Sequence, residues 1–102
     1  MNEINILVLA NHPEILETIL RLISKNDNWK GFGADSPEQA FAAMEKNKFD
    51  LVLLGVGVDE NAGQQITEYC HAAEPKIACI RHYGGGSGLL FSEIQHALQT
   101  EK

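Results

Sequence analysis

Short apolar runs alternate with helical patterns along this chain, and this alternation restricts the possible folds more than any other feature. The two strongest runs lie at Ile4–Ala10 and Phe49–Leu54. Runs of this length, rich in branched residues, are typical of strands that are covered on both faces of a parallel sheet. Segments with apolar residues at helical spacing follow them, so the chain is predicted to consist of βαβ units.

Local signals place the remaining elements. Ser36 and Gln39 form a capping-box pattern with a proline at the first helical position, which marks a helix start. Gly31 and Gly33 favour a sheet edge or a loop over the centre of the sheet for their segment. Helices are expected over residues 13–23, 37–46, 63–73 and after residue 88, with strands also at 29–34 and 76–80. The third helix is expected to turn Ile66, Tyr69, Cys70 and Ala73 inward.

Length and composition fit one small globular domain spanning residues 1–102. A net charge of −6 argues against nucleic acid or an anionic membrane as a partner. No apolar run reaches the roughly 18 residues of a membrane span, and the start lacks the basic segment of a secretory signal. Because the two cysteines, Cys70 and Cys79, do not make a disulfide framework, we expect a cytoplasmic protein.

Three segments of the chain resemble the receiver domain of the two-component response regulators. They are Val8–Pro13, Gly33–Ala40 and Phe49–Leu54, in the order and at the spacing of that family, and the resemblance covers residues 4–81. It implies a flavodoxin-like open parallel sheet with helices on both faces. It also implies a role in bacterial signal transduction.

The positions that would carry phosphoryl transfer hold unsuitable residues. The resemblance places the phospho-acceptor aspartate at Gly55, the Mg²⁺-binding acidic pair at Ala10 and Asn11, and the switching threonine or serine at Ile80 or Arg81. Glycine has no side chain to phosphorylate, and Mg²⁺ prefers carboxylate oxygens. The chain is therefore predicted to be a degenerate pseudo-receiver that is not an enzyme and holds no metal or other cofactor.

The segment between Arg81 and Leu89 is too short for a complete receiver. Only the seven residues 82–88 separate them, whereas a parallel crossover needs about a dozen or more. The fourth helix and fifth strand of the receiver fold are thus predicted to be missing, which leaves four strands in the order 2-1-3-4. The last strand becomes an edge, a liability unless covered. The candidate dimer edge comprises Ile77, Ala78, Cys79 and Ile80.

These observations favour a non-phosphorylatable protein-interaction domain that binds a protein partner or a second copy of itself. The alternative is a small-molecule or anion-binding module at the carboxyl ends of the strands, where open α/β sheets bind ligands. Its glycine loop precedes a helix but lacks the dinucleotide and Walker spacings. Candidate ligand residues are His12, Arg81, His82, Gly84, Gly85, Gly86, Ser87 and Gly88.

Two further clusters are interpreted as structural. The Cys-x-x-His pair Cys79 and His82 lacks the four ligands of a zinc site. The segment Asp59–Glu60 is expected to be a solvated acidic loop that offers Arg81 a weak surface ion pair. No metal site is expected.

Overall fold

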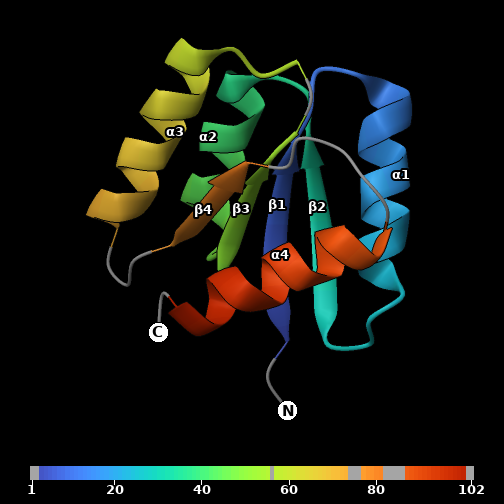
Figure 1. Cartoon of the computed structure of the whole chain (residues 1–102). Coiled ribbons are helices and arrows are strands. Elements are labelled where there is room, and N and C mark those ends of the chain that lie inside the picture. The colour runs from blue at the N-terminus through green and yellow to red at the C-terminus, as the bar shows by residue number, and fades with distance from the viewer. Residues whose placement is uncertain (1–2, 56, 74–76, 82–86, 101–102) are drawn as a thin grey trace.

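The computed structural model describes residues 3–55, 57–73, 77–81 and 87–100, with the side chains of residues 92–98 in the last helix. Strands and helices alternate in this part of the chain, as the sequence predicts (Figure 1). The elements are β1 (Ile4–Leu9), α1 (Pro13–Ser24), β2 (Trp29–Ala34), α2 (Pro37–Lys46), β3 (Leu51–Leu54), α3 (Glu60–Ala72), β4 (Ala78–Arg81) and α4 (Ser87–Thr100).

The four strands form one parallel sheet in the order β2-β1-β3-β4. The predicted order is confirmed, and so are the edge position of β2 and the direct succession of β4 and α4 in the described chain. β3 is buried at every residue, as is β1 from Ile6 onward, because helices cover both faces of these central strands. This is why their sequences are continuously apolar.

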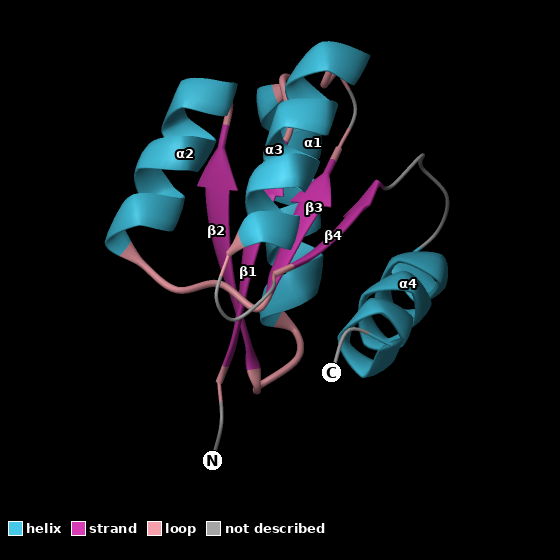
Figure 2. Ribbon diagram, turned by 90° about the vertical axis from the view of Figure 1, so that its left-hand side faces the viewer, coloured by secondary structure: helices cyan, strands magenta, loops and turns pink. Residues whose placement is uncertain are grey.

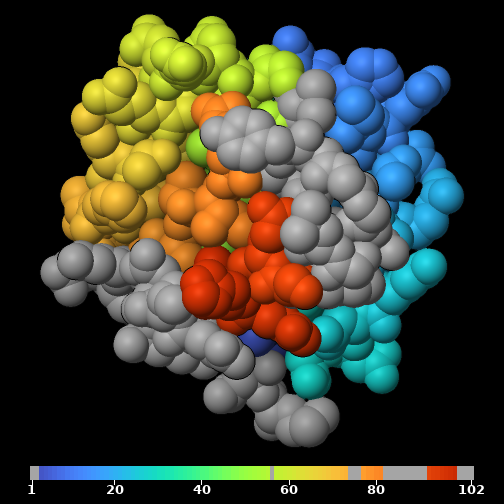
Figure 3. Space-filling view, viewed as in Figure 1, coloured from blue at the N-terminus to red at the C-terminus, as the bar shows by residue number. Residues whose placement is uncertain are grey.

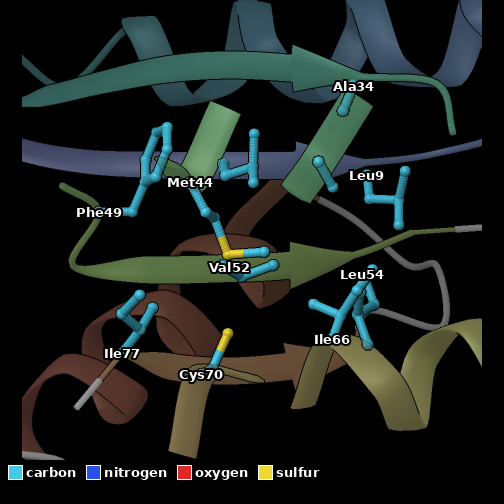
Figure 4. Close-up of a cluster of buried hydrophobic side chains, with 11 residues drawn as sticks. Leu9, Ala34, Met44, Phe49, Val52, Leu54, Ile66, Cys70 and Ile77 are labelled. Atoms are coloured by element: carbon cyan, nitrogen blue, oxygen red, sulfur yellow. The ribbon is translucent and has the colours of Figure 1, made fainter. Parts of the chain in front are cut away.

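The helices divide into two pairs, one on each face of the sheet. Ile19 and Ile23 of α1 and Ile94 and Ala97 of α4 pack on one face. The other face carries a cluster to which α2 and α3 contribute (Figure 4). Whereas α1 runs alongside the strands, α4 crosses them steeply, and Figure 2 shows α2 and α4 on opposite sides of the strands. None of the helices in the described ranges is long and apolar enough to cross a membrane.

The helix α3 begins at Glu60, three residues before the predicted start. Asp59 precedes it, and its carboxylate accepts a hydrogen bond of 2.7 Å from the backbone N–H of Ala62. This N-cap satisfies the backbone N–H of Ala62 in the first turn, so Asp59 and Glu60 are exposed, as expected, but they begin a helix instead of lying in a loop. The prediction for Tyr69 is also wrong, since it is 38% exposed and packs edge-on against the ring of Phe41.

The edge strand β4 begins at Ala78, later than predicted. The N–H of Ile77 is bonded to the carbonyl of Cys70 at the end of α3, which keeps Ile77 out of the sheet. Ile77 and Ala78 are buried, at 8% and 2% exposure, so the apolar side chains at the start of this edge are covered within the chain. At the other end of the segment, Ser87 and Gly88 belong to α4 and not to the predicted glycine loop.

Candidate functional site

The carboxyl ends of β1 and β3 bring Ala10 and Gly55 together. The N–H of Gly55 donates to the carbonyl of Leu9 over 2.7 Å, and the N–H of Ala10 donates to the carbonyl of Ala34 over 3.1 Å. These bonds extend the ladders one residue beyond the strands. Both residues are buried, whereas Asn11 is exposed. The three candidate positions therefore lie together at the carboxyl ends of the two central strands.

Gly55 is packed too closely for a side chain to be added without movement. A Cβ built on it would lie 3.1 Å from the Cβ of Ala10 and 3.2 Å from the carbonyl oxygen of Leu9. Both contacts are tighter than ordinary van der Waals separation, and one partner is rigid backbone. The end of β1 thus occupies the space beside the position to which the resemblance assigns the phospho-acceptor.

These residues do not fit a bound Mg²⁺ ion. Ala10 offers a methyl group, Gly55 offers nothing, and Asn11 offers one neutral amide oxygen, whereas Mg²⁺ sites in proteins use one or two carboxylates. Within the described ranges, no group of three or more histidine, cysteine, aspartate or glutamate side chains is placed to hold a metal ion.

A small cavity of about 190 Å³ lies beside these positions, between the starts of α2 and α3. Its charged lining residues are Asp35 and Asp59. Sequence reasoning did not assign either to the site, although Asp35 directly follows β2 and Asp59 stands at cap spacing from Ala62. The lining also includes Leu9, Asn11, Ser36, Pro37, Gly57, Val58 and Ala62.

Arg81 reaches from the end of β4 to the loop between β3 and α3. Its guanidinium donates a hydrogen bond of 3.0 Å to the carbonyl of Val58. The same group fills the space that a Cβ on Gly63 would occupy, so it passes over the first turn of α3 because Gly63 has no side chain. The expected pairing of Arg81 with the acidic segment is thus replaced by a bond to a backbone carbonyl.

The other predicted residues are more dispersed. His12 is the exposed N-cap of α1 and contributes through its carbonyl, which accepts from Leu16 over 2.9 Å. The structure separates Ile80 from this site, because its side chain packs against the cluster beneath α1 and α4. The predicted ligand residues His82, Gly84, Gly85 and Gly86 lie outside the described residues.

The strand β4 forms one edge of the sheet and is bonded to β3. The N–H of Ala78 donates to the carbonyl of Asp50 over 3.3 Å, on the side of β3. Since successive residues of a strand direct their backbone groups to alternate sides, Cys79 directs its N–H and C=O to the open side. Figure 3 shows atoms of β4 (orange) at the surface between α3 (yellow) and α4 (red).

Comparisons with known proteins show what this fold is. No model of a known protein family matches the chain, and no curated protein sequence is significantly similar to it. Among solved structures, it is similar to a signal receiver domain of an HD domain-containing protein from Pseudomonas fluorescens Pf-5, with a TM-score of 0.83 and 16% identity. That match covers 98% of each chain.

Other receivers give the same result. A CheY-like response regulator receiver domain protein from Methanospirillum hungatei JF-1 matches with a TM-score of 0.80 and 15% identity, over 98% of this chain and 97% of that one. A receiver domain protein from Clostridium thermocellum matches with a TM-score of 0.71 and 16% identity, over 96% of each chain. The chain therefore has the receiver fold, with four strands in its sheet.

Proposed function

We propose that this chain is a signalling module with the receiver fold that binds a protein partner without being switched by phosphorylation. The observation that carries the proposal is the packing at Gly55. The position assigned to the phospho-acceptor has no side chain, and its Cβ would lie within 3.1 Å of Ala10. The neighbouring Ala10 and Asn11 supply no carboxylate.

Arg81 supports the same proposal from the opposite side of the site. In this chain a permanent charge on β4 holds the loop before α3, through the bond to Val58. A hydrogen bond from a charged donor contributes about 1.5–3 kcal/mol. The loop therefore has a constant anchor, and its position does not depend on a phosphoryl group arriving.

The partner that we propose is a second copy of the chain, joined along β4. The outward backbone groups of Cys79 supply hydrogen bonds that a strand from another chain satisfies. A two-fold axis beside β4 would pair the two copies antiparallel and remove both edges. The acidic net charge of −6 makes nucleic acid a poor partner.

The alternative, an anion-binding module, has less support. The charged residues that line the cavity at the strand ends are the aspartates Asp35 and Asp59, which repel an anion. A thermal-shift titration with inorganic phosphate distinguishes the two functions. We expect no saturable stabilisation, and a saturable rise in the melting temperature would favour the anion-binding module.

Phosphorylation is tested by incubating the chain with acetyl phosphate and Mg²⁺ and recording the intact mass. We expect no phosphorylated species, while a receiver with an intact acidic site, treated in parallel, gains one phosphoryl group. An added phosphoryl mass on this chain would overturn the proposal.

Self-association is tested separately, by sedimentation equilibrium of the reduced chain over a wide concentration range. We expect a reversible dimer. Exclusive monomer at millimolar concentration would overturn the proposed partner and leave the phosphorylation claim standing.

A further inference from the structure

The two cysteines meet between α3 and β4, although nothing in the proposed function uses them. Cys70 is fully buried on the inner side of α3, where Figure 4 shows it among the side chains beneath that helix. Cys79 lies on β4, is half-buried and packs against the same cluster. Each cysteine is the first influence on the pKa of the other. The N–H of Ile77, two residues before Cys79, is bonded to the carbonyl of Cys70 over 3.1 Å, so the two cysteines, nine residues apart in sequence, are neighbours at the boundary between α3 and β4.

A third group, Thr67, approaches Cys79 from one turn earlier in α3. Its hydroxyl oxygen lies 3.5 Å from the sulfur of Cys79. The same hydroxyl is within 2.8 Å of the carbonyl of Gly63, so its proton can turn from that carbonyl to the sulfur. The guanidinium of Arg81 acts on the same sulfur as a nearby positive charge.

This environment makes the two cysteines chemically different. The hydrogen bond from Cys70, aided by Thr67 and Arg81 and opposed by burial, lowers the pKa of Cys79 to about 7. The same hydrogen bond, together with burial, raises the pKa of Cys70. At neutral pH Cys79 therefore exists partly as the thiolate, which is the reactive form, while Cys70 keeps its proton.

We propose that Cys79 and Cys70 form an oxidation site, in which a hydroperoxide oxidises Cys79 and Cys70 then closes an intramolecular disulfide. The arrangement joins a half-exposed thiolate to an adjacent buried thiol, which is the arrangement typical of redox-sensing cysteines. The disulfide would join α3 to the edge strand.

Both steps balance with hydrogen peroxide as the oxidant. The Cys79 thiolate attacks one peroxide oxygen, the O–O bond breaks, and the products are a sulfenic acid and hydroxide, which takes up a proton to become water. The sulfur of Cys70 then attacks the sulfenic sulfur. The S–O bond breaks, and the thiol proton of Cys70 leaves with the hydroxyl group as a second water.

The geometry allows this closure with a small movement. A disulfide requires a Cα–Cα separation of about 4.4–6.8 Å, so closure requires α3 and β4 to hold the two cysteines within that range while the sulfur atoms approach to bonding distance. β4 spans four residues and pairs with β3 on one side, so it can shift more easily than the central strands. The site is independent of the proposed function, because it does not require phosphorylation to be absent or a partner to bind.

The test is to treat the reduced full chain with hydrogen peroxide, alkylate with N-ethylmaleimide and record the intact mass and the modified residues. We expect both cysteines to lose reactivity together, the mass to fall by two hydrogen atoms, and the rate to rise as the pH increases through about 7. Accumulation of a Cys79 sulfinic acid with Cys70 still alkylated would overturn the proposal, as would no reaction at either residue.

Variants separate the roles of the two sulfur atoms. Cys70→Ala is expected to slow the oxidation of Cys79, because the thiol that lowers its pKa is removed, and to stop at the Cys79 sulfenic acid, which dimedone traps. Cys79→Ala is expected to leave Cys70 unoxidised. In the unaltered chain, N-ethylmaleimide should modify Cys79 at least about tenfold faster than the buried Cys70. Equal rates would contradict the assignment.

A third variant keeps both cysteines and is less disruptive to packing, so it tests the activation of Cys79 without the risk that the chain fails to fold. Thr67→Val keeps the side-chain volume and removes the hydroxyl near Cys79. We expect slower alkylation of Cys79 at neutral pH and an unchanged rate at pH values where the thiol is fully ionised in both proteins. A rate that is unchanged at both pH values would show that Thr67 does not activate Cys79.

Discussion

The loop after β2 and the loop after β3 both lead into a capped helix, yet they are held in different ways. After β2, the hydroxyl of Ser36 accepts from the N–H of Gln39 over 3.2 Å, and the side chain of Gln39 accepts from the N–H of Asp35 over 3.0 Å. Every bond there is local. After β3, the cap of Asp59 is also local, but Val58 is bonded to Arg81, which follows 23 residues later.

The two loops therefore differ in whether residues distant in sequence hold them. The side-chain bonds of the loop after β2 join residues at most four positions apart, so the local sequence predicts them. The loop after β3 depends on β4 and on Asn11, beside which Gly57 turns with φ of +89°. The bond from Arg81 to Val58 and the close approach of Gly57 to Asn11 therefore both lie next to the position that resembles the phospho-acceptor site of a receiver.

Of the substitutions considered, Gly57→Ala is expected to cause the largest loss of unfolding free energy, through the loop after β3. A non-glycine residue in the left-handed region costs roughly 1–2 kcal/mol. The added Cβ would also lie 2.7 Å from the Cβ of Asn11, so the loss should total about 3 kcal/mol of unfolding free energy in urea.

The control for Gly57→Ala is Gly31→Ala in β2. Its added Cβ would first meet the flexible end of Leu20, so we expect a change within about 1 kcal/mol. Equal stability of the two variants would show that the loop after β3 is no more constrained than β2.

Arg81→Ala is expected to lower the unfolding free energy by about 2 kcal/mol, because it removes the hydrogen bond from a charged donor to the carbonyl of Val58. The matched control is Lys30→Ala on the other edge strand. The exposed ammonium of Lys30 lies 5.5 Å from the ring centre of Phe32, a contact worth about 0.5–1 kcal/mol. If thermal melts show a larger loss of stability for Lys30→Ala than for Arg81→Ala, the anchoring role of Arg81 is contradicted.

A double-mutant cycle of Gly63→Ala and Arg81→Ala isolates the contact over the first turn of α3. Alanine should stabilise a helix by about 1 kcal/mol relative to glycine, and that gain should appear in the Arg81→Ala background. In the unaltered chain the new methyl group displaces the guanidinium, so we expect a coupling of at least about 1 kcal/mol. Strict additivity would show that Arg81 does not need the space at Gly63.

Apart from the controls, Ser36→Ala should cost the least, about 1 kcal/mol, because it removes one side-chain cap. His12→Ala at the start of α1 is the control, since His12 makes no side-chain cap bond. Hydrogen exchange should show faster opening of the first turn of α2 only. Faster exchange in the loop after β3 would indicate that the two loops are coupled.

The sequence predicts the elements and their order because periodicity and caps are local signals. The sequence-based prediction places the start of α3 at Gly63, because the glycines before it indicate a loop. The helix in fact starts earlier, since Asp59 caps it by accepting from the N–H of Ala62, three residues later. The prediction also misses the bond between Arg81 and Val58, because no local pattern reports a contact between β4 and a preceding loop. The missing acidic residues were predictable from the resemblance, whereas the close packing of Gly55 required coordinates.

The most direct test of the central claim is a titration of the isotope-labelled chain with beryllofluoride and Mg²⁺, followed by ¹H–¹⁵N correlation spectra. The amide signals to follow are those of Gly55, Gly57 and Arg81. We predict no saturable shift beyond those caused by Mg²⁺ or fluoride alone, because no carboxylate at Ala10, Asn11 or Gly55 holds the metal or the phosphoryl mimic. Saturable shifts at these amides would contradict the account.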